Sequence, residues 1–319
     1  MPTYWQLLLL ILPVFALIAI GAVMRRLRWL NAEADASLLK LVVNFLYPCL
    51  IFDNVMGNAA LRQPGNLFLA PLVGFAMIAM GIGIAYYAGK SLGLTHGQGL
   101  RTFAFTTGIN NYGYIPIPLM AALFGPASLG VLFVHNVGCE GAIWTVGILV
   151  LAGLSLREGW RKLANPPVFA LIAAVAVNTL NLGRFMPSVA VNVIHVSAAC
   201  AVPLGLMLIG ATLVEYFSRP CELFDMRVTV ASSVLRLGLL PVVFLVVARF
   251  LPCSDDLKRV MIVEAAMPAG ILPIVIAKHY GGRPLTAVQV VVGTTVLGLF
   301  LIPLWLRLGL WWLNQTTVL

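Results

Sequence analysis

The chain has 319 residues, of which 61% are hydrophobic and only 10% are charged, and its formal net charge is +9. Average soluble chains are about 25% charged, so these side chains are too few to cover a globule in water. The composition therefore excludes a soluble domain and predicts an all-α protein whose apolar surface faces lipid.

Ten apolar stretches are candidates to cross a bilayer, whose core of about 30 Å needs roughly 20 helical residues. Arginines follow the first stretch rather than precede it, so we expect a retained span and not a cleaved signal peptide. The predicted spans are 5–24, 37–56, 67–89, 101–124, 127–151, 167–182, 189–213, 227–250, 259–279 and 285–312.

The basic residues gather between alternate spans, which indicates membrane topology rather than a nucleic-acid partner. With the N-terminus outside, the outer regions hold six Lys and Arg and the inner loops hold 13, which are Arg25, Arg26, Arg28, Lys40, Lys90, Arg101, Arg157, Arg161, Lys162, Arg219, Arg227, Lys278 and Arg283. The positive-inside rule then places both termini outside a cell membrane, the inner membrane if the source is bacterial.

The cysteines indicate neither a disulfide framework nor a zinc site, because their number is odd and no C-x-x-C spacing occurs. We expect them to be small apolar fillers, and we expect no metal and no cofactor. They are Cys49, Cys139, Cys200, Cys221 and Cys253.

Proline and glycine patterns repeat between the two halves of the chain. Gly113-Tyr-Ile-Pro116 in the fourth span matches Gly270-Ile-Leu-Pro273 in the ninth, 157 residues later. Each half would hold five spans, and because five is odd the second half must enter the membrane from the opposite side. We therefore predict two inverted repeats, residues 1–153 and 163–316, a plan common in secondary transporters.

The fourth and ninth spans cannot be regular helices, because each proline removes a backbone donor and clashes with the preceding turn. The predicted breaks involve Pro116, Pro118, Pro268 and Pro273. Two helices broken at matching places indicate a binding site near the middle of the membrane. The N-terminal ends of the half-helices there would favour an anion. The alternative is two ordinary proline kinks.

Asn110 and Asn111 stand within the first break and supply hydrogen-bond donors and acceptors, to the broken backbone or to a substrate. Four ionisable residues also lie within spans, where such groups are costly: Glu140, Arg236, Glu264 and His195. Either glutamate is a candidate to take up a coupling H⁺ or Na⁺, and a structural ion pair with Arg236 is the alternative. Alternatively, Arg236 is a candidate to bind a substrate carboxylate through two parallel hydrogen bonds. His195 is expected in packing or at the interface, and His135 and His279 near loops.

Residues 265–284, which read AAMPAGILPIVIAKHYGGRP, resemble the ninth span of the auxin efflux carrier family. Asn111 followed by Pro118-Leu119 and Gly125 resembles the fourth-span pattern of that family. The long central loop of the plant carriers is absent. Pro116 stands where their pattern usually has Gly, and Glu264 replaces an uncharged residue.

The resemblance implies a fold like that of sodium/proton antiporters and bile-acid symporters, with spans 1, 2, 6 and 7 as a scaffold that often dimerises. Spans 3–5 and 8–10 would form a mobile domain that moves like an elevator, with the substrate at the crossover of spans 4 and 9. Asn136 approximates a further polar position of the family. The predicted substrate-binding residues are thus Asn110, Asn111, Tyr112, Gly113, Asn136, Arg236 and Gly270.

The sequence therefore predicts a secondary carrier of a small organic anion. A cation-coupled symporter of the bile-acid class is the main alternative, and a channel is a weaker one. An intramembrane enzyme is disfavoured, because no paired catalytic motif occurs.

Overall fold

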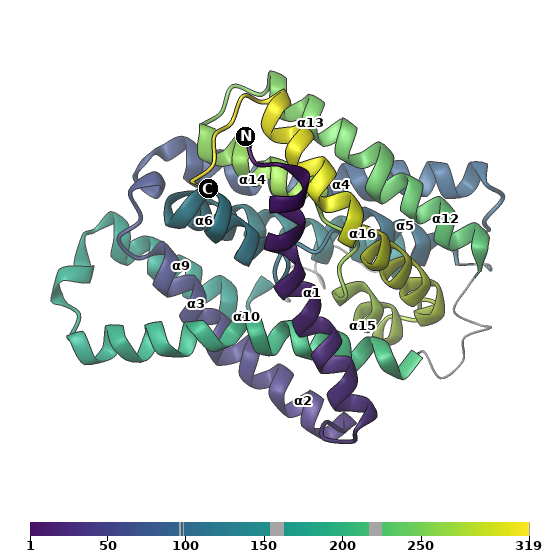
Figure 1. Ribbon diagram of the computed structural model, residues 1–319, viewed down its shortest axis with the longest axis horizontal. Helices are drawn as coiled ribbons and strands as arrows, with labels where there is room; N and C mark the ends of the chain where they lie inside the picture. The colour runs from purple at the N-terminus through teal and green to yellow at the C-terminus, as the bar shows by residue number, and fades with distance from the viewer. Residues whose placement is uncertain (96, 98, 154–162, 217–224, 319) are drawn as a thin grey trace.

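The computed structural model describes residues 1–95, 97, 99–153, 163–216 and 225–318, and this part of the chain is helical without β-strands. Five residues named above lie outside the described residues: Arg157, Arg161, Lys162, Arg219 and Cys221. The arrangement of the helices is shown in Figure 1. The longer elements are α1 (Tyr4–Arg26), α2 (Ala32–Leu41), α3 (Tyr47–Val55), α4 (Pro64–Ser91), α5 (Leu100–Gly108), α6 (Pro116–Ala142), α7 (Ile148–Ala152), α9 (Pro166–Thr179), α10 (Ser188–Tyr216), α12 (Met226–Val234), α13 (Leu240–Phe250), α14 (Asp255–Ala266), α15 (Leu272–His279) and α16 (Pro284–Trp312).

Short turns complete the described chain. π-Helical turns join several helices without breaking them, and 3₁₀ turns lie in two loops. These turns are η1 (Val42–Leu46), η2 (Ala59–Arg62), η4 (Ile143–Gly147), η6 (Leu182–Phe185) and η7 (Leu235–Leu239).

Seven helices of the described chain are long and apolar enough to cross a membrane. They are Tyr4–Arg26, Glu33–Val55, Pro64–Ser91, Pro116–Ala152, Ser188–Val214, Met226–Phe250 and Pro284–Trp312. The protein is therefore a multi-pass membrane protein. The other predicted spans differ for physical reasons. Residues 101–124 and 259–279 are interrupted by non-helical segments, and 167–182 contains α9, which has only 14 residues.

Helix α6 bends sharply at Gly125, whose φ is 74° and ψ is −171°. Glycine adopts positive φ without the steric cost that a Cβ would impose. The continuous apolar stretch Pro116–Ala152 has 37 residues, well beyond the roughly 20 that one crossing needs. The bend at Gly125 thus divides this stretch at the boundary expected between the fourth and fifth spans.

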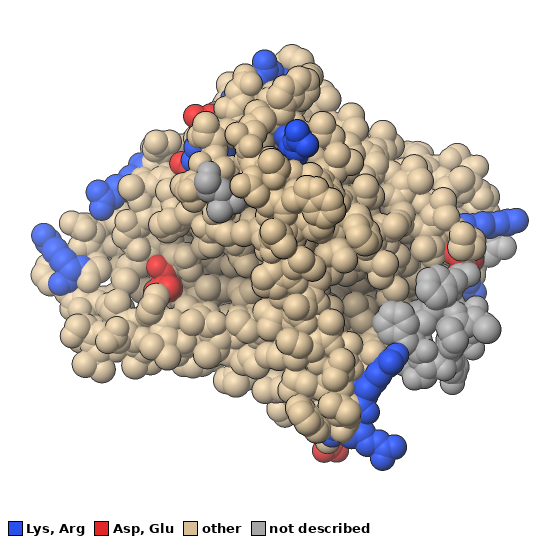
Figure 2. Space-filling view, in the orientation of Figure 1, with Lys and Arg blue, Asp and Glu red and all other residues tan. Residues whose placement is uncertain are grey.

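Charged side chains lie mostly around the edges of the face in Figure 2, and a broad uncharged surface runs between them. Large apolar side chains of several helices are well exposed, for example Phe68, Ile172 and Val196. Helices α6 and α16 are the most deeply buried of the long helices, and α1 is largely peripheral. The exposed apolar belt is the surface that lipid would cover.

Glycines allow two pairs of helices to touch backbone to backbone. A Cβ at Gly138 of α6 would lie 1.7 Å from the carbonyl oxygen of Pro71 in α4. A Cβ at Gly210 of α10 would lie 1.8 Å from the carbonyl oxygen of Ile18 in α1. In each pair, a side chain at the glycine would force the two backbones apart.

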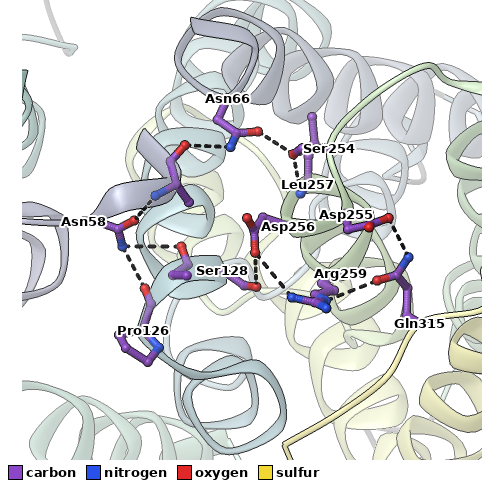
Figure 3. Close-up of polar contacts among 12 residues, drawn as sticks. Asn58, Asn66, Pro126, Ser128, Ser254, Asp255, Asp256, Leu257, Arg259 and Gln315 are labelled. Carbon is purple, nitrogen blue, oxygen red and sulfur yellow. Dashed lines mark hydrogen bonds and ion pairs between the residues drawn. The ribbon is translucent and has the colours of Figure 1, made fainter. Parts of the chain in front are cut away.

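Polar contacts join the two predicted halves at one end of the molecule (Figure 3). Ser254 Oγ donates to Asn66 Oδ1 at 2.5 Å, and Ser128 Oγ donates to Asp256 Oδ1 at 2.6 Å. Arg259 contacts Asp256 and the side chain of Gln315. These contacts bind the starts of α4 and α14 and the bend of α6 to the C-terminal segment.

Asn58 connects this network to α9. Its Nδ2 donates to the carbonyl oxygen of Pro126 at 2.8 Å, just after the α6 bend. Its own backbone carbonyl accepts from Asn178 Nδ2 of α9 at 2.9 Å. One loop residue therefore ties α9 to the bent helix.

Candidate functional site

The two interruptions predicted from prolines and glycines meet inside the protein. Residues 109–115 separate α5 from α6, and residues 267–271 separate α14 from α15. The segments pair in an antiparallel bridge between Asn110 and Ala269. Asn111 N donates to Pro268 O at 2.8 Å, and Gly270 N donates to Ile109 O at 3.0 Å. Backbone groups that leave a helix in a membrane need partners, and here each segment supplies them to the other.

The predicted prolines lie at or beside these breaks. Pro116 and Pro118 begin α6, and Pro273 stands in the first turn of α15, where a missing N–H costs nothing. Pro268 lies in the extended segment, and its carbonyl accepts the bond from Asn111. Gly270 permits the close approach, because a Cβ there would lie 2.9 Å from Asn110 O.

Asn110 bonds the carboxylate of Glu264. Its Nδ2 donates to Glu264 Oε2, and both side chains are buried. The contact joins residues 154 positions apart and holds the two broken helices together beside the bridge. Glu264 Oε1 is buried and has no hydrogen-bond partner in the described part of the chain.

Asn111 is 7% exposed, and its Oδ1 accepts from Ile115 N at 3.4 Å. Asn136 of α6 donates to the backbone carbonyl of Tyr112 at 2.7 Å. The carbonyl of Gly113 accepts from Ile117 N at 3.3 Å and so belongs to the first turn before α6. Asn136 therefore fixes the path of the interrupted segment.

Glu140 lies one turn after Asn136 on α6 and accepts two hydrogen bonds. Tyr112 Oη donates to Oε1 at 2.6 Å, and Trp144 Nε1 donates to Oε2 at 2.8 Å. Both carboxylate oxygens thus have donors, which favours a role in holding the broken segment against α6.

Replacing Tyr112 by Phe is expected to lower the free energy of unfolding by about 1–2 kcal/mol, because Glu140 Oε1 loses its donor inside the protein. Unfolding in mixed micelles measures the change, with Tyr87→Phe on the exposed surface of α4 as control. An effect equal to that of the control would mean that the Tyr112 hydroxyl adds nothing to Glu140.

Arg236 is fully buried in η7, between α12 and α13. Its Nε donates to Met267 O at 3.1 Å, next to the bridge, and its guanidinium lies 5.4 Å from the centre of the Phe244 ring. Nη1 and Nη2 have no hydrogen-bond partner among the described residues. Arg236 and Glu264 interact electrostatically, but the described chain contains no direct hydrogen bond between them.

The histidines correct one expectation. His135 is not near a loop but is buried in the middle of α6, where Nδ1 lies 3.4 Å from Asn136 Oδ1. The bend at Gly125 starts the fifth span ten residues earlier, so position 135 falls within the bilayer region. His195 is exposed and lies 3.2 Å from Asp53, and His279 ends α15.

Sequence reasoning missed several residues around the breaks. Thr294 Oγ1 of α16 accepts from Ala269 N at 3.1 Å. Tyr114 packs edge to face with Tyr47 of α3, with ring centres 6.1 Å apart. The Tyr114 ring also covers Gly205 of α10, where a Cβ would lie 2.0 Å from it. No periodicity within one helix signals contacts between such distant segments.

Comparison with known proteins identifies the family of this chain. A family described as membrane transport protein matches residues 7–158 and 154–306. The chain belongs to this family. An uncharacterized transporter of Methanothermobacter thermautotrophicus is 26% identical over 301 residues, which cover 92% of this chain and 96% of the relative. Auxin efflux carrier component 8 of Arabidopsis thaliana is 20% identical over 318 residues, with 82% and 85% covered.

Membership confirms the resemblance to auxin efflux carriers that residues 265–284 carry. Proteins of this family are transporters, so the alternative of an intramembrane enzyme is excluded. The family match spans both predicted halves of the chain, including both helix interruptions.

Proposed function

We propose that this transporter is a secondary carrier of a small organic anion, with a carboxylate bound where the two helix interruptions cross. The observation that carries the proposal is Arg236, a fully buried guanidinium beside the bridge whose two terminal nitrogens have no partner among the described residues. Arginine presents two parallel N–H groups that match a carboxylate. The two terminal nitrogens of a buried guanidinium are suited to donate to the oxygens of a bound anion.

Other features at the crossing also favour negative charge. The N-terminal ends of α6 and α15 lie next to the paired segments, and a helix N-terminus carries partial positive charge and unpaired N–H groups. Asn111 and Gly270 border the same place. The proposal keeps the substrate-binding residues that the sequence predicts. Within that set, Asn136 and Tyr112 would shape the interrupted segment between α5 and α6 rather than donate hydrogen bonds to the anion.

The proposal includes ten spans in two inverted repeats and alternating access of the elevator type. Gly138 locks α4 to α6, and Gly210 locks α1 to α10, which supports two separate bodies. Between these two bodies, the ring of Tyr114 covers Gly205 of α10. Such a contact can shift without unpacking either body. We further propose a homodimer in a cell membrane with both termini outside.

Coupling is assigned to Glu264 rather than Glu140. One carboxylate oxygen of Glu264 has no hydrogen-bond partner among the described residues, whereas both oxygens of Glu140 accept hydrogen bonds. Arg236 balances either an ionised Glu264 or a substrate carboxylate. When Glu264 is protonated, the guanidinium charge is balanced by the anion instead, so one proton would accompany each negative charge. A nearby guanidinium disfavours Na⁺ at the same place.

The test is transport in proteoliposomes with a panel of mono- and dicarboxylates, comparing the protein with Asn111→Ala. We expect saturable uptake of at least one acid and a loss of tenfold or more in the variant, because the Asn111 side chain lies in the interrupted segment that borders the proposed site. Asn31→Ala, which removes an exposed helix cap on α2, is the matched control.

Two further arms separate the alternatives. A strict need for a Na⁺ gradient would replace the proposal by a sodium-coupled symporter of the bile-acid class. Counterflow, in which unlabelled acid inside accelerates uptake of labelled acid, is expected of a carrier, and its absence together with non-saturating flux would indicate a channel.

A further inference from the structure

Buried hydroxyl groups without partners lie on the helices around Arg236 and Glu264. They belong to Thr106 and Thr107 of α5 and to Thr229 and Ser233 of α12, and none has a hydrogen-bond partner in the part of the chain that the structure describes. A buried hydroxyl left unpaired is costly, and folded proteins usually satisfy such groups with ordered water.

Those on α12 share one helix face with Arg236. Thr229 and Ser233 are four residues apart, and Arg236 follows three residues later in η7. This face packs against α16 at Gly293, where a Cβ would lie 2.6 Å from Thr229 Cγ2 and 3.6 Å from Ser233 Oγ. Because Gly293 has no side chain, Thr229 and Ser233 lie next to the α16 backbone.

On α5, Thr106 follows Thr102 by four residues, so both lie on one face. Thr102 Oγ1 accepts from Arg283 N at 2.9 Å, which directs this face toward the start of α16. Helix α5 packs against both α16 and η7. The hydroxyl groups on α5 and α12 therefore lie on helices that pack against α16, and α5 also packs against η7, the turn that carries Arg236.

We propose that Thr102, Thr106, Thr229 and Ser233 form a hydrated hydroxyl track that delivers protons from the α15–α16 loop to Glu264. The proposal rests on the coupling role proposed for Glu264. A proton entering from water at the loop passes along bound water molecules and adds to Glu264 Oε1, the carboxylate oxygen that Asn110 leaves free. After the mobile domain has moved, the Oε1–H bond breaks and the proton passes to water on the opposite side of the membrane, so it crosses together with the anion.

The charges around Glu264 favour a proton over a metal ion. The ionisable groups that act on it are Arg236 of η7, Cys139 of α6 and Tyr47 of α3. The positive guanidinium repels a metal cation, and neutral hydroxyls offer it no compensating charge. A proton instead forms a covalent bond with the carboxylate and needs no coordination shell.

Thiol labelling tests the track without any substrate. In a variant with all five cysteines replaced, Thr106→Cys and Ser233→Cys are each treated in proteoliposomes with methyl methanethiosulfonate, a small uncharged reagent. Val228→Cys, buried on the same helix as Ser233, is the matched control. We expect both track cysteines to react at least tenfold faster than the control. Equal rates at the three positions would overturn the track.

A second arm tests proton delivery. Thr106→Val combined with Ser233→Ala is expected to slow acid-driven transport at least fivefold and to leave the KM for the anion unchanged. An unchanged rate would refute delivery along these hydroxyls. If no acid is transported while the track cysteines still react rapidly, the anion-carrier proposal fails and the hydrated track stands, so the two failures are distinguishable.

Discussion

Replacing Arg236 by Gln is expected to lower the free energy of unfolding by about 3 kcal/mol, because removal of one partner leaves a buried charge uncompensated. The charge that remains is Glu264, which is fully buried and held only by Asn110 among the described residues. Unfolding in mixed micelles measures the loss.

A second substitution identifies the cause. Glu264→Gln added to Arg236→Gln removes the unpaired charge, so most of the lost stability is expected to return. Arg307→Gln, at an exposed position of α16, is the control and should change little. An undiminished loss in the double variant would show that Arg236 stabilises by packing alone.

Gly138→Ala is expected to destabilise the protein by about 3 kcal/mol, at the upper end of the range for overpacking. The new methyl group would lie 1.7 Å from the Pro71 carbonyl oxygen, so the backbones of α4 and α6 must separate. Rigid backbone atoms cannot turn aside as a flexible side chain can. Thermal unfolding in detergent gives the effect.

Gly141 provides the matched control on the same helix. A Cβ there would lie 3.5 Å from a Phe75 ring carbon, an ordinary contact. Because alanine favours a helix over glycine by roughly 1 kcal/mol, Gly141→Ala should leave stability unchanged or raise it. The predictions for the two glycines therefore differ in sign, and a similar loss at both positions would mean that helix contact distance does not decide the outcome.

Local features of the sequence were enough to predict where the helices break. Pro116, Pro118 and Pro273 act within one turn of themselves, so their effect on the backbone can be read without knowing what surrounds them. The apolar stretches likewise located the long helices. The predicted length of the sixth span was less accurate, because apolar residues continue past Thr179, where α9 ends.

The partners of the buried polar groups could not be predicted in the same way. Asn110 meets Glu264 across 154 residues, and nothing in either segment specifies the other. The contact between Glu140 and Trp144 is different, since a spacing of four residues on one helix places them together. The Glu140–Trp144 pair can therefore be predicted from the sequence. It distinguishes Glu140, which has a donor on its own helix, from Glu264, whose Oε1 has no hydrogen-bond partner among the described residues.

Asn58 is expected to affect the rate of the proposed transport cycle. Its hydrogen bonds to Pro126 and from Asn178 fasten α9 to the bent helix α6. In the proposed elevator cycle α9 and α6 separate, so at least one of these two bonds must break in every turnover. At about 1 kcal/mol, that bond would lengthen the dwell in this conformation by roughly fivefold. Asn58, a loop residue at one end of the molecule, would then limit the rate of the transport cycle without contacting the substrate.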